Sequence, residues 1–182
     1  PRLELLLMQR AEHPRDPWSG HISLPGGRVE ASDADPLAAA IRETEEEVGL
    51  RLQAGQLLGP LDDLAAVGGR PGLVIRPFVF LIGAERPPLR PNAEVAGLHW
   101  IQLHDLLGGL GRGRMELLHQ QRRHTLPCVD LGGDRRLWGL TLRILDGLLD
   151  RIDGQGVGLS RPTAPGHAPG HAPGHAHDVE RP

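Results

Sequence analysis

The sequence predicts an α/β (α+β) domain in which helices cover a mixed β-sheet. Apolar segments of strand length occupy residues 3–10 and 73–82, and the second is rich in β-branched and aromatic side chains. Segments with helical periodicity occupy residues 35–48 and 137–152. Strands and helices that alternate irregularly are typical of a sheet packed under helices.

Shorter segments complete the expected order. Residues 22–27, ISLPGG, predict a short strand that ends in a double glycine, and residues 98–103, LHWIQL, predict another strand. The first strand comes almost directly after Pro1, so a preceding strand could have been lost to truncation or to a wrong gene start.

The composition divides the 182 residues into a domain and a tail. We expect residues 1–153 to form one domain. In residues 154–182 a Pro-Gly-His-Ala unit repeats with almost nothing apolar to bury, so we expect this tail to be disordered. Its histidines could bind a transition metal loosely, although drift in a low-complexity segment is the favoured explanation.

Charge and cysteine content exclude several classes of protein. The net charge of −3 gives no reason to expect binding to nucleic acid or to an acidic membrane. A single cysteine, Cys128, which we expect to be buried, excludes an internal disulfide and a cysteine-based zinc site. The longest apolar run, residues 5–8, is too short to span a bilayer. We therefore expect a cytoplasmic protein that acts on a small molecule.

The helix expected over residues 35–48 has clear signals at both ends. Asp35 is a suitable N-cap, Pro36 suits the first helical position, and Gly49 stands where a C-cap belongs. Residues at helical spacing are expected to face the core, namely Leu37, Ala40, Ile41, Thr44 and Val48.

Glutamates cluster at the end of that helix. Glu43, Glu46 and Glu47 have the spacing of one helix face, whereas Glu45 points elsewhere. Three carboxylates on one face repel each other unless a hard cation such as Mg²⁺ binds them. Arg42 could pair with one carboxylate and fix its orientation. The alternative explanation is a solvated acidic stripe.

The residues before the helix favour the metal site. Gly26 and Gly27 allow the backbone to approach a ligand closely, and a glycine carbonyl there could complete a metal shell. The order of strand, double glycine, acidic loop and glutamate helix resembles the Nudix hydrolase family, whose box is Gly-x5-Glu-x7-Arg-Glu-U-x-Glu-Glu-x-Gly-U, with U a bulky apolar residue. Residues 42–50, RETEEEVGL, match its second half except at Thr44.

The first half of the box departs from the general pattern, because Asp33 replaces its glutamate and eight residues separate Asp33 from Arg42. This spacing looks like that of the coenzyme A diphosphatase branch. The residues that fall in the order of that branch are Leu6, Leu7, Arg10, Arg15, Gly20, Pro25, Gly26, Gly27, Asp33, Ala40, Arg42 and Glu43. Met8, Ala11, Leu24, Glu30 and Ala39 depart from it and put the substrate in doubt.

The resemblance implies a Nudix-type α/β/α sandwich that hydrolyses a nucleoside-linked diphosphate with Mg²⁺ or Mn²⁺. The implied catalytic residues are Arg42, Glu43, Glu46 and Glu47, with Glu94 from a later loop as a base or ligand. The implied metal ligands are Gly27, Glu43, Glu46 and Glu47. Candidate phosphate contacts are Arg10, Arg15, Arg28 and Arg70. For Glu94 and the arginines, the alternative is a solvated surface residue.

Coenzyme A or an acyl derivative is the expected substrate, giving 3′,5′-ADP and phosphopantetheine. The same chemistry on ADP-ribose or a dinucleoside polyphosphate is the nearest alternative. A catalytically silent nucleotide-binding module is a further one, although such a module has no need to retain mutually repelling carboxylates. The expected partner is a nucleotide, not nucleic acid or membrane, and a homodimer is left open.

Overall fold

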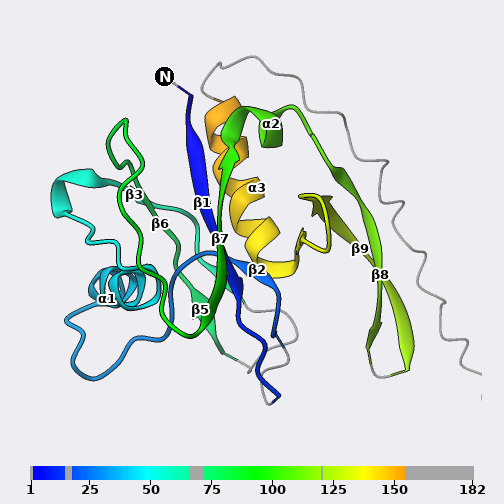
Figure 1. The fold of residues 1–182 in the computed structure, drawn as a ribbon, viewed down its shortest axis with the longest axis horizontal. Coiled ribbons are helices and arrows are strands. Elements are labelled where there is room, and N and C mark those ends of the chain that lie inside the picture. Colours follow the sequence, from blue (N-terminus) through cyan, green and yellow to red (C-terminus); the bar gives the residue numbers. More distant parts are fainter. Residues whose placement is uncertain (1, 15–17, 66–71, 120, 155–182) are drawn as a thin grey trace, which may run out of the picture.

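The structure is a computed structural model that describes residues 2–14, 18–65, 72–119 and 121–154. At its centre β2 (Ile22–Ser23), β1 (Glu4–Arg10) and β7 (Val95–Gln102) form an antiparallel sheet in that order (Figure 1). Leu7 of β1 lies opposite His99 of β7 in the register of this sheet.

Helices cover both faces of the central sheet. Helix α1 (Pro36–Val48) packs on one face, where its Val48 joins Met8 in a buried cluster. Helices α2 (Leu103–Leu107) and α3 (Gly139–Asp153) pack on the other face around Leu7. Because successive residues of a strand point to opposite faces, Leu7 and Met8 anchor the two layers. The predicted architecture of helices over a sheet is confirmed. The sheet was expected to be mixed, but every strand pair in the described ranges is antiparallel.

Three further sheets flank this sandwich. A short 3₁₀ turn, η1 (Ala54–Gln56), leads into the two-stranded sheets, which pair β3 (Leu57–Pro60) with β6 (Phe78–Phe80) and β4 (Leu64–Ala65) with β5 (Val74–Ile75). The third sheet contains β10 (Arg136–Trp138), β9 (Arg122–Asp130) and β8 (Arg112–His119). Its β8 and β9 extend away from the sandwich as a long ribbon (Figure 1).

The caps of α1 are as predicted. The Asp35 carboxylate accepts the Ala38 N–H at 2.8 Å, Pro36 occupies the first turn, and Gly49 ends the helix with a φ of 70°. The predicted inward stripe is only partly right, because the buried residues of the helix are Ala39, Thr44, Glu47 and Val48. The helix is rotated so that Glu47 turns toward the sheet while Leu37, Ala40 and Ile41 are only half-buried.

Two predicted elements need correction. The strand expected over 73–82 is split into β5 and β6, because Pro77 has no N–H to donate within a sheet. The helix expected over 137–152 starts at Gly139, because residues 136–138 pair with β9 instead. The strand expected over 98–103 is confirmed, although β7 begins at Val95 and Leu103 already belongs to α2.

Three further expectations concern the rest of the chain. Cys128 is a buried free cysteine, as predicted. Among the residues with a described placement, no helix is long and apolar enough to cross a membrane. The tail beyond residue 154 lies outside the described residues.

Candidate active site

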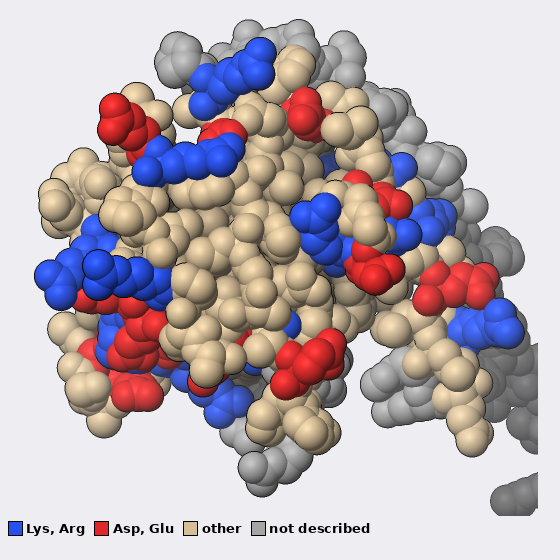
Figure 2. Space-filling model, in the orientation of Figure 1, with Lys and Arg blue, Asp and Glu red and all other residues tan. Residues whose placement is uncertain are grey.

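Three segments meet at one end of α1 and enclose a cavity of about 380 Å³. They are the loop that follows β2, the helix itself and the loop that precedes β7. The side chains that line the cavity are Arg28, Glu30, Arg42, Glu43, Glu46, Glu47, Asn92 and Glu94. Figure 2 shows acidic side chains gathered over α1 with arginine side chains beside them. The cavity is therefore lined by charged and polar side chains, most of them acidic.

Glu47 is the most buried acid of this cavity. Only 4% of it is exposed, and the Gly26 N–H donates to its Oε2 at 2.8 Å. Burial, and to a lesser degree the nearby Glu43 carboxylate, raise the pKa of Glu47 to about 7 against the opposing effect of the Gly26 hydrogen bond. The positive charge of Arg10 acts in the opposite direction and lowers this pKa, so Arg10 lies close enough to the cavity to act on Glu47.

Glu43 lies directly against the Gly27 backbone. A Cβ atom added at Gly27 would stand 2.2 Å from Glu43 Oε1, so only glycine leaves room for this carboxylate. Gly26 is required for a different reason, because its φ is 144° while nothing lies within 4 Å of an added Cβ. Gly27 therefore leaves room for the Glu43 carboxylate of the site, whereas Gly26 allows the backbone conformation of the turn.

Alanine substitution should separate these two roles. We expect Gly27→Ala to displace Glu43 and lower kcat/KM by about 10- to 100-fold, with little loss of stability because a flexible side chain can move. Gly26→Ala should instead destabilise the fold by about 1–3 kcal/mol, because alanine is strained at that φ. Urea unfolding and steady-state kinetics on both variants measure the difference. Equal effects of both variants on stability and rate would contradict it.

Arg42 holds the acids of the loop and the helix together. Its Nε and Nη2 donate to the two carboxylate oxygens of Asp33, both at 3.0 Å. Its Nη1 donates to Glu46 Oε2 at 3.1 Å and lies 3.2 Å from Glu43 Oε1. Its Nη2 also donates to the Arg28 carbonyl at 3.1 Å. The predicted pairing of Arg42 with a carboxylate is confirmed.

The Asp33–Arg42 pair shifts both groups toward their charged forms. The hydrogen bond from Arg42 lowers the pKa of the Asp33 carboxyl, and the Glu30 N–H that it also accepts lowers it further. The Asp33 hydrogen bond raises the pKa of the Arg42 guanidinium. Asp33 thus fixes the arginine that in turn fixes Glu46.

The remaining candidates take different places. Glu94 and Arg28 line the cavity, whereas Arg15 and Arg70 lie outside the described residues. Glu45 is exposed and pairs with Arg51 at 2.6 Å.

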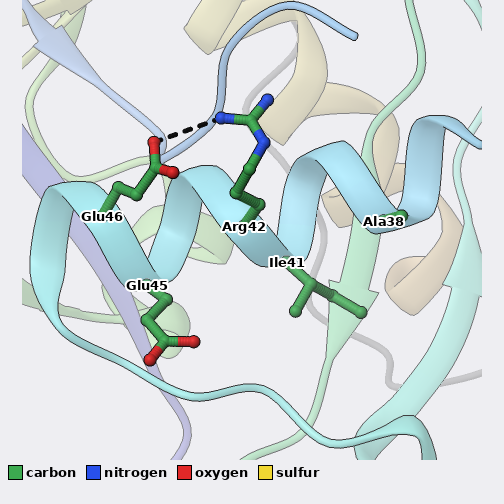
Figure 3. A pocket seen from close by; sticks show the side chains of 5 residues that line it. All are labelled: Ala38, Ile41, Arg42, Glu45 and Glu46. Carbon is green, nitrogen blue, oxygen red and sulfur yellow. Dashed lines mark hydrogen bonds and ion pairs between the residues drawn. The ribbon is translucent and has the colours of Figure 1, made fainter. Parts of the chain in front are cut away.

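The outer face of α1 has an open pocket of its own. This pocket of about 450 Å³ is lined by Ala38, Ile41, Arg42, Glu45 and Glu46. Figure 3 shows Ile41 and Glu45 pointing to one side of α1 while Arg42 and Glu46 point to the other. Glu45 therefore extends away from the pairing of Arg42 with Glu46.

The fit of the cavity to a divalent cation rests on its donor atoms. In the described part of the chain, no three His, Cys, Asp or Glu side chains are already arranged to hold a metal, and Glu46 pairs with Arg42. The oxygen donors themselves suit a hard cation, and the mutual repulsion of Glu43 and Glu47 would be relieved by one. The predicted ligand set of Gly27, Glu43, Glu46 and Glu47 stays a prediction. The oxygen donors of these residues are of the kind that a divalent cation binds.

Three residues of the site were not assigned a role from the sequence. Asp33 was noted only for its spacing, Glu30 was noted only as a departure from the branch pattern, and Asn92 was not singled out at all. The replacement of the box glutamate by another acid could have indicated the partner of Arg42. The local turn in which Asn92 accepts the Glu94 N–H does not show from sequence that this residue reaches the site, because its bond to the Glu47 carbonyl joins segments that are far apart in the chain.

Comparisons with known proteins bear on this fold and site. A model of the NUDIX domain matches residues 1–126. A protein described as "Uncharacterized Nudix hydrolase NudL" from Yersinia pestis (strain Pestoides F) is 32% identical over 152 residues, which are 84% of this chain and 74% of that protein. Its counterpart from Yersinia pseudotuberculosis serotype O:1b (strain IP 31758) matches equally.

Solved structures agree on the fold. A MutT/nudix family protein from Enterococcus faecalis has a TM-score of 0.53 and 25% identity, and the match covers 84% of this chain but only 56% of that chain. The NUDIX domain of Shewanella oneidensis NrtR, crystallised with ADP ribose, has a TM-score of 0.52 and 16% identity over 83% of this chain and 79% of that chain. These likenesses show that the chain has the Nudix fold. The chain belongs to the NUDIX domain family and is a Nudix hydrolase.

Proposed function

We propose that the chain is a divalent-metal-dependent diphosphatase that hydrolyses coenzyme A or an acyl derivative to 3′,5′-ADP and phosphopantetheine. The observation that supports diphosphate chemistry is the cavity itself, in which Glu43, Glu47 and Glu94 converge from two segments. The resemblance of residues 6–50 to the coenzyme A diphosphatase branch supports the choice of substrate.

The residues of the chain have separate tasks in this proposal. Glu43, Glu46 and Glu47 would hold the cation, preferably Mg²⁺ or Mn²⁺, with the Gly27 carbonyl. When bound, the cation would neutralise phosphate charge and make a water molecule a stronger nucleophile. Glu94 would act as the base or complete the ligand set.

Arginines bind the substrate phosphates. Arg28 lines the cavity, and Arg10 is close enough to act on Glu47, so both can pair with phosphate oxygens in the geometry that arginine prefers. The same role is proposed for Arg15 and Arg70, and it rests only on their positions in the sequence.

A product assay decides the substrate. The protein is incubated with Mg²⁺ and coenzyme A, ADP-ribose, NADH or diadenosine polyphosphates, and the products are separated by chromatography. We expect coenzyme A to be cleaved at the diphosphate bond with the highest kcat/KM. Turnover of ADP-ribose or a dinucleoside polyphosphate alone would refute the coenzyme A proposal. Turnover of none would favour a silent nucleotide-binding module, which calorimetric titration with the same nucleotides would then detect.

A further inference from the structure

Asn92 lines the acidic cavity but carries no charge. It lies between β6 and β7, two residues before Glu94 and far along the chain from α1. The proposed chemistry gives it no role with the substrate or the cation. Its contacts nevertheless connect the two acids that reach the cavity from different segments.

The backbone of Asn92 ties its loop to the end of α1. Its N–H donates to the Glu47 carbonyl at 2.9 Å, and the Arg90 N–H donates to the Val48 carbonyl at 2.8 Å. Carbonyls in the last turn of a helix lack intrahelical partners, so these bonds complete the C-terminal end of α1. They also fix the distance between the loop and the helix turn that carries Glu47.

The side chain of Asn92 fixes Glu94. Asn92 Oδ1 accepts the Glu94 N–H at 2.8 Å, in the side-chain-to-backbone pattern that asparagine favours in turns. On its other side, the Glu94 carbonyl accepts the Ala11 N–H at 2.8 Å. Both backbone groups of Glu94 are therefore held, one by Asn92 and one by the end of β1.

We propose that Asn92 is a positioning residue that holds Glu94 in the cavity beside Glu43 and Glu47. The inference rests on the proposed function for its effect on rate, but its structural part can be tested separately. Alanine at position 92 keeps the backbone bond to Glu47 and removes only the Oδ1 acceptor. Aspartate keeps that acceptor.

Kinetics on four variants test the effect on rate. We expect Asn92→Ala to lower kcat by about 10- to 100-fold with little change in KM, because groups that orient a ligand or base have effects of this size. Asn92→Asp should recover most of that loss. Asn92→Ala combined with Glu94→Gln should be no slower than Glu94→Gln alone, because both act through one group. The proposal would be overturned if the falls in kcat of the two single variants multiplied in the double variant, or if Asn92→Ala left kcat unchanged.

A matched control separates positioning from general loss of stability. Asp35→Ala removes the cap bond to the Ala38 N–H at the other end of the same helix, far from the cavity residues along α1. This variant should be less stable yet keep its kcat within about twofold, since its bond touches none of the acids. A comparable fall in kcat would mean that loss of helix stability explains Asn92→Ala as well.

Amide hydrogen exchange gives a readout that needs no substrate. The Glu94 N–H should exchange at least about tenfold faster in Asn92→Ala than in the wild type or in Asn92→Asp, because it loses its acceptor. Unchanged exchange would overturn the proposal even if the protein hydrolyses coenzyme A. Faster exchange in a protein that hydrolyses none of the tested compounds would refute the proposed function and leave the structural role of Asn92 intact.

Discussion

Glu47→Gln is expected to abolish hydrolysis and, at the same time, to stabilise the metal-free protein at pH 8. The loss of rate should reach about 10³-fold, because a bound cation supplies several kcal/mol of transition-state stabilisation and Glu47 is the most buried of its proposed ligands. Steady-state kinetics with Mg²⁺ measure this loss.

The gain in stability follows from the pKa of Glu47. Burial raises this pKa from 4.5 to about 7, so the folded protein binds a proton more tightly than the unfolded chain does. The free energy of unfolding of the wild type should therefore fall as the pH rises from 4.5 to 7. At pH 8 the ionised group costs about 3 kcal/mol, and glutamine, which can still accept the Gly26 N–H, should recover about 1–3 kcal/mol of it.

Urea unfolding in EDTA at pH 5 and pH 8 measures this gain. The variant should exceed the wild type in stability at pH 8 and lose most of its advantage at pH 5. Glu45→Gln is the matched control, since Glu45 is exposed on the same helix and pairs with Arg51. It should change neither stability nor rate appreciably. A Glu47→Gln variant that is less stable at pH 8, or that keeps its activity, would show that Glu47 is not a ligand held under repulsion.

The helix that carries these acids was predictable because its signals are local. Asp35, Pro36 and Gly49 specify its ends through their own backbone preferences, and the structure has these caps. Spacing along the helix also separated Glu45 from the other glutamates. Its exact rotation was not predictable, because the packing of Val48 against Met8 decides which residues are buried.

Other features depend on contacts that a single segment cannot specify. The apolar run over 73–82 suggested one strand, but Pro77 divides it between two partners. The β8–β9 ribbon carries charged residues on exposed positions and lacks the apolar alternation that predicts a strand. The bond from Asn92 to Glu94 is local, but only the folded chain brings Asn92 to the Glu47 carbonyl at the end of α1.

Arg42→Lys is the second substitution with a large expected effect. Lysine keeps the positive charge but cannot donate in parallel to both Asp33 oxygens while also holding Glu46. We expect kcat/KM to fall by about 10- to 100-fold and the affinity for Mn²⁺, measured by calorimetric titration, to fall as well. Arg51→Lys is the matched control, because the Arg51 side chain is 84% exposed and pairs with Glu45 outside the cavity.

The partner of Arg42 should respond in the same way if the two act as one unit. Asp33→Asn combined with Arg42→Lys should be scarcely slower than Arg42→Lys alone. The pH dependence has a defined sign, because Arg42 lowers the pKa of Asp33 below its ordinary 3.8. The stabilising effect of this pair is therefore present above pH 3.8 and is lost as the pH falls through the lower pKa of the folded state. Two outcomes would contradict this role of the arginine: independent effects of the two substitutions, or an Arg42→Lys variant with wild-type affinity for Mn²⁺. Either would mean that Arg42 does not orient the acids. The cavity would then acquire its geometry from the loop of Gly26 and Gly27 alone.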